Sequence, residues 1–286
     1  MRKLSLCLLS VFILCAFNGV AFAAKEKKGI IVAAFGSSVP EAIESIQKFA
    51  VSLAADYPES RIVVAFNSAQ ILNYLDYEPK IPSVTHAITT MADEGINEIS
   101  VLALYVSAGA NYYKLVNDVN ALSQLYGSKV NIKVSLPLAG TEQDVFTLAS
   151  YLIYSMPADI KPGDAVIYVA RGAEGTGSVL YPAMNWALFL QGEKGSLHMV
   201  VNLEQDESIK NAMQIIKSNK RKNVWIIPLL VTYGKRASED IFNTKDNSVS
   251  SRFHDAGLTV RPFKHGLVSN EAVANLWKAQ LRKITN

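Results

Sequence analysis

Apolar and polar positions along the chain follow two alternating patterns. Short apolar runs rich in β-branched residues predict strands at Gly29–Phe35, Arg61–Phe66, Glu98–Val106, Val130–Leu138, Ala165–Ala170, His198–Leu203, Val224–Val231 and Leu258–Phe263. Segments with helical periodicity lie between them, at Pro40–Ala55, Ser83–Glu94, Tyr112–Leu125, Gln143–Tyr154, Val179–Leu190, Ser208–Ser218 and Asn270–Ile284. Because the strand segments are apolar on both faces, the alternation predicts an α/β fold in which helices cover parallel sheets.

Three segments of the first half of the chain recur in the same order in the second half. GIIVAAFGSS (29–38) resembles AVIYVARGAE (165–174), RIVVAFNSAQ (61–70) resembles HMVVNLEQDE (198–207), and ISVLALYVSAGANY (99–112) resembles VWIIPLLVTYGKRA (224–237). Single matches between apolar strands are common, but three in one order indicate a duplicated unit. We therefore predict two similar halves, residues 24–140 and 141–286, each a four-stranded parallel sheet flanked by helices, with a cleft between them.

The first 23 residues have the pattern of a secretory signal peptide. Arg2 and Lys3 precede an apolar stretch, and Ala21-Phe22-Ala23 supplies small residues at the cleavage position. The apolar stretch is shorter than the roughly 20 residues that span a bilayer. We therefore expect residues 1–23 to be removed and the product to be exported, in the periplasm of a Gram-negative cell, with no membrane span.

Removal of this segment changes what the composition allows. Both cysteines, Cys7 and Cys15, leave with it, so the remaining chain has no disulfide and no thiolate metal site. Loss of Arg2 and Lys3 lowers the formal net charge from +3 to +1, which does not indicate a nucleic-acid partner. Nucleotide-binding loops and the serine-hydrolase elbow are absent from the sequence. The sequence leaves a homo-oligomer open.

Polar and aromatic residues follow several of the predicted strands. Ligands of open parallel sheets bind at the carboxyl ends of the strands, so these residues are the candidates for a site in the cleft. They are Phe35, Ser37, Ser38, Tyr105, Tyr112, Arg171, Glu204, Lys235, Arg236 and His265.

Several of these segments carry a resemblance to a known family. FGSS after the first strand, SAGANYYKL after the third and PLLVTYGKRASEDI near the end resemble the anaerobic sirohydrochlorin cobaltochelatases, a class II chelatase family. The resemblance covers nearly the whole chain after the signal segment. It implies two chelatase-like α/β halves and insertion of cobalt, sometimes iron, into a polycarboxylated tetrapyrrole, a lyase reaction of anaerobic cobalamin biosynthesis. Some exported relatives are linked to haem.

The sequence departs from this family at the metal site. The family's Gly-His-Gly and Gly-Asp-His-Ala patterns correspond here to Ala170-Arg171-Gly172 and Gly234-Lys235-Arg236-Ala237. A guanidinium group stays protonated and has no lone pair to offer a metal ion. The family's third ligand, a glutamate, corresponds to Glu204, or to Asn202 if two residues are shifted.

Two functions therefore stay open. The first is a cobaltochelatase whose substrate metal and proton are handled by other residues, such as Glu204, His265 or Tyr105. The second is an exported carrier of haem or another tetrapyrrole, in which Arg171, Arg236 and Lys235 pair with ring carboxylates. Lys235 and Arg236 have a simpler alternative, which is pairing with Glu239 and Asp240 on the same segment. Two lobes around a cleft also describe periplasmic solute-binding proteins.

Overall fold

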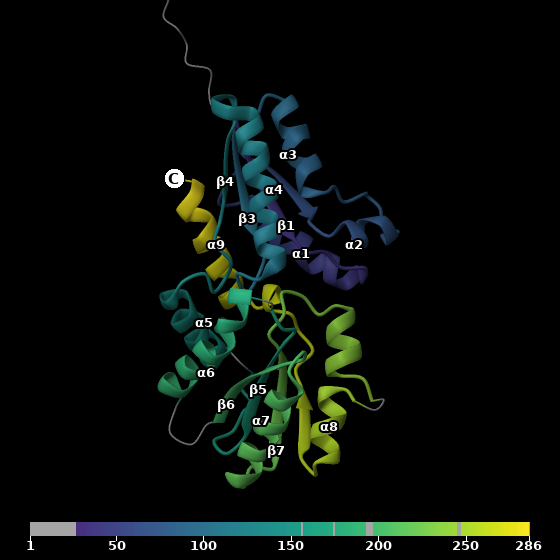
Figure 1. Cartoon of the computed structure of the whole chain (residues 1–286), viewed down its shortest axis with the longest axis vertical. Helices are drawn as coiled ribbons and strands as arrows, with labels where there is room; N and C mark the ends of the chain where they lie inside the picture. The colour runs from purple at the N-terminus through teal and green to yellow at the C-terminus, as the bar shows by residue number, and fades with distance from the viewer. Residues whose placement is uncertain (1–26, 156, 174, 193–196, 245–246, 286) are drawn as a thin grey trace, which may run out of the picture.

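The computed structural model describes residues 27–155, 157–173, 175–192, 197–244 and 247–285 (Figure 1). The predicted signal peptide lies outside the described residues. The strands form two four-stranded parallel sheets, which confirms the predicted fold class. The first sheet has the order β2-β1-β3-β4, with β1 at Lys28–Ala34, β2 at Arg61–Phe66, β3 at Glu98–Ala103 and β4 at Asn131–Val134. The second has the order β6-β5-β7-β8, with β5 at Ala165–Ala170, β6 at Leu197–Asn202, β7 at Asn223–Pro228 and β8 at Thr259–Pro262.

Each segment with predicted helical periodicity forms a helix. These helices are α1 (Pro40–Leu53), α3 (Val84–Asp93), α4 (Ala110–Tyr126), α5 (Glu142–Tyr154), α6 (Leu180–Gln191), α7 (Asp206–Ser218) and α9 (Glu271–Thr285). Two short helices were not among the predicted segments, α2 (Ala69–Tyr74) and α8 (Val249–Asp255). None of the helices within the described residues is long and apolar enough to cross a membrane.

The two sheets repeat the same register. Gly29 lies opposite Arg61 in the first sheet, and Ala165 lies opposite Leu197 in the second. The structure therefore matches Arg61 with Leu197, one residue earlier than the sequence comparison, which paired it with His198. Because successive side chains of a strand point to opposite faces, this correction decides which residues of β2 and β6 are equivalent on each face.

Helices cover both faces of each sheet. Side chains of α3 and α4 pack on the outer face of the first sheet, and those of α7 and α8 pack on the outer face of the second. The inner faces share one continuous core, to which α1, α5, α6 and α9 contribute. Because this core spans both sheets, burial of apolar surface holds the two halves together as one folded unit.

The last helix returns from the second half to the first. Figure 1 shows α9 beside β3 and β4, although it follows β8 in the chain. Trp277 of α9 is fully buried, meets Phe49 of α1 edge-on, and donates from Nε1 to the backbone oxygen of Tyr105 at 3.3 Å. Lys278 Nζ lies 3.3 Å from Asp56 Oδ2 after α1. The C-terminal helix thus completes the helical layer on the first sheet.

Trp277→Ala should lower the free energy of unfolding by about 3–5 kcal/mol, because it removes a large fully buried side chain and leaves a cavity. Urea unfolding measures this loss. Leu125→Ala is the matched control, since Leu125 is 76% exposed on α4 and should change stability by about 0.5 kcal/mol at most. A loss below about 1 kcal/mol for Trp277→Ala would mean that α9 does not hold the halves together.

His198 of β6 lies beside Tyr168 on the inner face of the second sheet. Tyr168 of β5 is fully buried and its hydroxyl donates to the backbone oxygen of Leu152 at 2.9 Å. Because that bond uses the hydroxyl hydrogen, His198 Nδ1, 3.1 Å away, acts as the donor to the Tyr168 oxygen. Burial lowers the pKa of His198 to about 4, so the imidazole is neutral in the fold.

The neutral state of His198 predicts a specific pH dependence. An unfolded chain binds a proton at His198 below about pH 6.5, whereas the folded chain does so only near pH 4, so stability falls as the pH is lowered through this window. Urea unfolding from pH 7 to pH 4 should show a steeper loss for the wild type than for His198→Gln. His86→Gln, at an exposed position of α3, should follow the wild type. Parallel profiles for wild type and His198→Gln would contradict the burial account.

Candidate functional site

A cleft of about 880 Å³ lies between the two halves, at the carboxyl ends of their strands. Its size is near the upper end of ordinary small-molecule pockets, which measure about 300–1,000 Å³. The loops after β1, β3, β5, β6 and β7 all contribute to its walls. Of the residues proposed from the sequence, the cleft is lined by Phe35, Ser37, Ser38, Tyr105, Tyr112, Arg171, Glu204, Lys235 and Arg236.

His265 lies elsewhere. It is exposed after β8, and its ring centroid is 4.8 Å from that of Phe263 rather than among the cleft-lining residues described. β8 is the edge strand of the second sheet, separated from β5 by β7. The carboxyl end of an edge strand is displaced from the sheet centre, where the cleft opens.

The wall from the first half is a tight turn between β1 and α1. The Ser37 hydroxyl accepts a hydrogen bond from the backbone nitrogen of Val39 at 3.1 Å, and Pro40 occupies the first turn of α1. Proline is suited to this position because its missing N–H would have no partner there. The turn holds Ser37 buried at the floor of the cleft and leaves the Phe35 ring facing the second half.

The equivalent turn after β5 brings Arg171 and Glu204 together. Gly172 has a φ of +116°, and Gly36 has one of +113° in the first half. Residues other than glycine rarely adopt this backbone conformation. A Cβ atom at Gly172 would lie 2.5 Å from Glu204 Oε2. The carboxylate of Glu204 therefore packs against the backbone of the Arg171 loop at Gly172, where the positive φ favours glycine.

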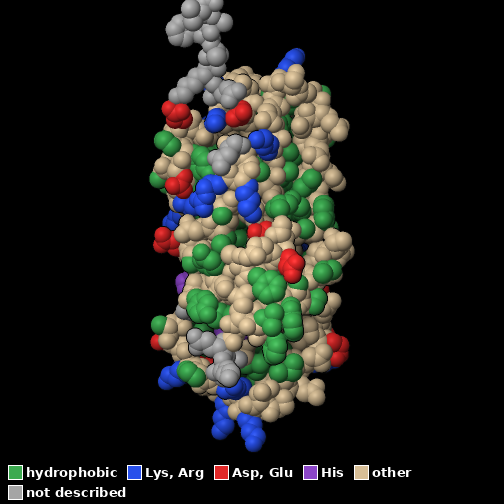
Figure 2. Space-filling model, turned by 90° about the vertical axis from the view of Figure 1, so that its left-hand side faces the viewer, with side chains coloured by type: hydrophobic (Ala, Val, Ile, Leu, Met, Phe, Trp, Pro, Cys, Tyr) green, Lys and Arg blue, Asp and Glu red, His purple; other side chains and the backbone are tan. Residues whose placement is uncertain are grey.

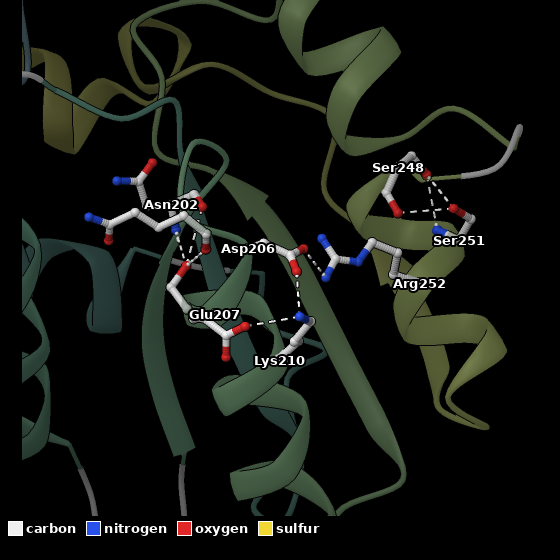
Figure 3. A network of polar contacts seen from close by, with 9 residues as sticks. Asn202, Asp206, Glu207, Lys210, Ser248, Ser251 and Arg252 are labelled. Atoms are coloured by element: carbon white, nitrogen blue, oxygen red, sulfur yellow. Dashed lines mark hydrogen bonds and ion pairs between the residues drawn. The ribbon is translucent and has the colours of Figure 1, made fainter.

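The turn that carries Glu204 is fixed by a network at the start of α7 (Figure 3). The Glu204 backbone nitrogen donates to Asn202 Oδ1 at 2.9 Å, and the Asn202 nitrogen donates to Ser208 Oγ at 2.9 Å. Asp206 pairs with Lys210 at 2.8 Å and with Arg252 of α8 at 2.6 Å. The hydrogen bond from Lys210, with the charge of Arg252, lowers the pKa of Asp206. These bonds hold the turn in place under the cleft.

Arg171 crosses the cleft to the other half. Its guanidinium carbon lies 5.6 Å from the ring centroid of Phe35, the residue that holds the equivalent position after β1. This distance is in the range of a cation–π contact. Among the described residues, Arg171 makes no ion pair within 4.0 Å, so no described carboxylate occupies its hydrogen-bond donors.

Lys235 and Arg236 do have partners. Arg236 Nη1 lies 2.9 Å from Asp240 Oδ2, and Lys235 Nζ lies 3.9 Å from Glu239 Oε1. The hydrogen bond that Arg236 donates to the Asp240 carboxylate raises the pKa of Arg236. All four side chains are at least one-third exposed, so these are surface pairs of small individual strength. The simpler alternative for these cations is therefore confirmed, while both still line the cleft.

The two tyrosines proposed for the cleft from the sequence are core residues. Tyr105 and Tyr112 are buried and meet edge to face, and the Tyr112 hydroxyl donates to the backbone oxygen of Ser135 at 3.2 Å. Burial raises the pKa of both phenols, which disfavours the tyrosinate form that would coordinate iron. Two further cleft tyrosines were missed: Tyr74, 81% exposed on α2, and Tyr181 of α6. The only sequence signal for α2 was its Ser68 N-cap.

Small residues bring the two halves into direct contact beside the cleft. A Cβ atom on Gly177 would lie 2.7 Å from the Cα of Gly109, and one on Gly109 would lie 3.3 Å from the Cβ of Ala173. The loop after β3 therefore packs directly on the loop after β5. Larger side chains at this contact would push the two halves apart and widen the cleft.

Imidazole does not contribute to the cleft. His86, His254 and His265 are exposed, and His198 is hydrogen-bonded to Tyr168 on the inner face of the second sheet. Within the described parts of the chain, no three His, Cys, Asp or Glu side chains lie close enough to hold a metal ion. The cleft is lined by three cations, Arg171, Lys235 and Arg236, and by two carboxylates, Glu204 and Glu239. The protonated donors of the three cations are suited to binding anions.

Comparison with known proteins places this site in a family. The protein-family model described as cobalt chelatase (CbiK) matches residues 28–286. A sirohydrochlorin cobaltochelatase, CbiKC, from Nitratidesulfovibrio vulgaris is 27% identical over 252 residues, which cover 88% of each chain. A sirohydrochlorin cobaltochelatase from Salmonella typhimurium is 24% identical over 263 residues, or 91% of this chain and 97% of the relative.

Solved structures show the same fold. The structure of SirB from Bacillus subtilis with Fe3+ superposes with a TM-score of 0.66 at 15% identity and covers 90% of this chain and 95% of SirB. The structure of CbiX, described as the terminal enzyme of sirohaem biosynthesis in denitrifying bacteria, gives a TM-score of 0.52 at 14% identity. The match covers 89% of this chain and 99% of CbiX. With a family model matched over nearly its whole length, the chain belongs to the CbiK cobalt chelatase family.

Proposed function

We propose that the chain binds a polycarboxylated tetrapyrrole in the cleft, holds it by its carboxylates, and does not insert a metal. The observation that carries this proposal is the presence of Arg171 and Arg236 in the cleft, at positions where the family resemblance implies metal-binding histidines. Sirohydrochlorin, the substrate in the names of its relatives, and haem are the two ligands to test.

The volume and the lining of the cleft support a flat conjugated ligand. Its volume of about 880 Å³ leaves room for a macrocycle between the two halves. Phe35 and the exposed Tyr74 present aromatic surface to it. Aromatic rings pack well on planar conjugated systems in offset or edge-on arrangements.

Arg171 is the main clamp in this proposal. A guanidinium group pairs with a carboxylate through two parallel hydrogen bonds, and such charge-assisted bonds are about twice as strong as neutral ones. Arg171 makes no ion pair with a described residue, so a ligand carboxylate need not displace any described carboxylate from it. Its cation–π contact with Phe35 fixes the side chain before the ligand arrives.

Lys235 and Arg236 are secondary contacts. Their pairs with Glu239 and Asp240 are exposed, and exposed pairs contribute about 0–1 kcal/mol. A ligand carboxylate can replace Glu239 or Asp240 at little cost. The segment after β7 then supplies charge along the rim, while Arg171 sets the position of the ring.

Family membership and Glu204 favour cobalt chelation as the second candidate function. Glu204 lines the cleft and could accept a proton from the macrocycle or bind the substrate metal. Its carboxylate is close enough to Arg236 and Tyr181 to act on both electrostatically. A carboxylate beside two guanidinium groups is a weak cobalt ligand, because the guanidinium charges repel the cation. We therefore place carriage of the ring ahead of its metalation.

We further propose that the protein works outside the cytoplasm. This rests on the first 23 residues, which have the basic, apolar and small-residue segments of a signal peptide. A binding protein in the periplasm needs no local cobalt supply, whereas a metalating enzyme there would. Export and the loss of histidine therefore point to the same function.

Arg171→Ala should weaken sirohydrochlorin binding about 10–100-fold, because it removes a charge-assisted pair of about 1.5–3 kcal/mol. Absorbance titration of the purified protein with sirohydrochlorin, and in parallel with haem, measures the dissociation constant. Arg282→Ala is the matched control, since Arg282 is exposed on α9 and does not line the cleft, and its dissociation constant should equal that of the wild type. Equal affinities for wild type and Arg171→Ala would refute the clamp, and no binding of either ring would refute the proposed function.

A further inference from the structure

The outer surface of α5 and α6 exposes several large apolar side chains. Figure 2 looks onto this side of the molecule, and hydrophobic side chains gather in the lower half of the view, over these two helices. We call the set the α5–α6 face. Its members and their exposed fractions are Tyr151 (39%), Tyr154 (71%), Trp186 (56%), Phe189 (74%) and Leu190 (52%).

The two helices form one surface. They lie side by side, joined by hydrogen bonds between the side chains of Ser150 and Gln191 and from Gln191 Nε2 to the backbone oxygen of Phe146 at 2.9 Å. On α6 the rings of Trp186 and Phe189 stack with centroids 5.7 Å apart. Their inner faces are buried in the shared core, so the outer apolar residues are not needed to cover it.

The described residues of α5 and α6 carry little charge. The twelve residues of α6, Leu180–Gln191, include no Lys, Arg, Asp or Glu. The acidic residues of α5 are Glu142 and Asp144, both in its first turn, and Asp144 lies 3.5 Å from Lys283 of α9. A helix at the surface of a soluble protein normally has a polar outer face. An outer face of Trp, Phe, Leu and Tyr is instead typical of the centre of a protein interface.

We infer that the α5–α6 face is covered by the same face of a second copy of this chain in a two-fold dimer. A fully buried aromatic side chain covers about 150–250 Å², so the exposed parts of these five residues amount to roughly 500 Å². That equals the largest apolar patches of monomeric proteins, about 300–600 Å², and with a rim it approaches the about 800 Å² per partner of a stable interface. In a two-fold dimer a patch meets itself, which an uncharged patch allows without repulsion.

The dimer leaves the cleft accessible. None of the five residues of the α5–α6 face lines it, although the inward-facing Leu180 and Tyr181 of α6 do. The inference therefore does not depend on the proposed ligand, and either can fail without the other. It assigns α6 two roles, a cleft wall on its inner side and an interface on its outer side.

Sedimentation velocity of the purified protein tests the inference. From about 1 to 100 µM, the wild type should pass from monomer to dimer. Trp186→Lys combined with Phe189→Lys should raise the dimer dissociation constant at least about 30-fold, because it removes two aromatic anchors and places like charges across the two-fold axis. Val51→Lys and Leu125→Lys are matched controls, since their side chains are 73% and 76% exposed outside this face, and both should dimerise as the wild type does.

Tryptophan fluorescence gives an independent measurement. The chain has three tryptophans, and Trp225 and Trp277 are buried, so Trp186 dominates quenching by acrylamide. Quenching of the wild type should fall as its concentration rises, and this change should be absent in Trp186→Phe. A wild type that stays monomeric at about 100 µM, or a double lysine variant that dimerises as well as the wild type, would overturn the inference. Binding of a monomeric wild type to phosphatidylcholine vesicles would also overturn it and assign the face to a lipid surface.

Discussion

The crossing of α9 back to the first sheet holds the two halves in one arrangement. A parallel sheet places its ligand-binding loops at one edge, and two such sheets form a common site only if those edges face each other. The burial of Trp277 among residues of the first half and its hydrogen bond to Tyr105 tie the end of the chain to the loop that follows β3. The continuous apolar core between the two sheets also holds the two halves together. Formation of the cleft is therefore a consequence of the core packing.

Within this frame, the chemistry of the cleft depends on which side chains follow each strand. Arg171 and Phe35 hold equivalent positions in the two halves and contact each other across the cleft. Gly172 lets the carboxylate of Glu204 approach the same loop, and the network around Asp206 holds the turn that carries it. The result is a chelatase fold with guanidinium groups in its cleft, and such groups attract anions and repel metal cations.

Much of the fold follows from the periodicity of apolar residues, but the contacts between elements do not. The pattern correctly predicts two parallel sheets and places Arg171, Lys235 and Arg236 in one cleft. Periodicity shows which face of a helix is buried but not what covers it, so the docking of α9 on the first sheet was not predicted. His265 was expected in the cleft because it follows a strand, yet β8 is an edge strand and ends to one side. The comparison of the two halves also matched Arg61 with His198, whereas the structure matches it with Leu197.

The central claim is that the cleft retains the ligand of its family and has lost metal insertion. The most direct measurement adds Co²⁺ to the purified protein saturated with sirohydrochlorin and follows the absorbance of the cobalt complex, with free sirohydrochlorin at the same concentration as the reference. The account predicts saturable binding of the ring and a rate of cobalt insertion no higher than the spontaneous rate. Insertion clearly above the spontaneous rate would contradict it and would show that this cleft metalates its substrate without imidazole ligands.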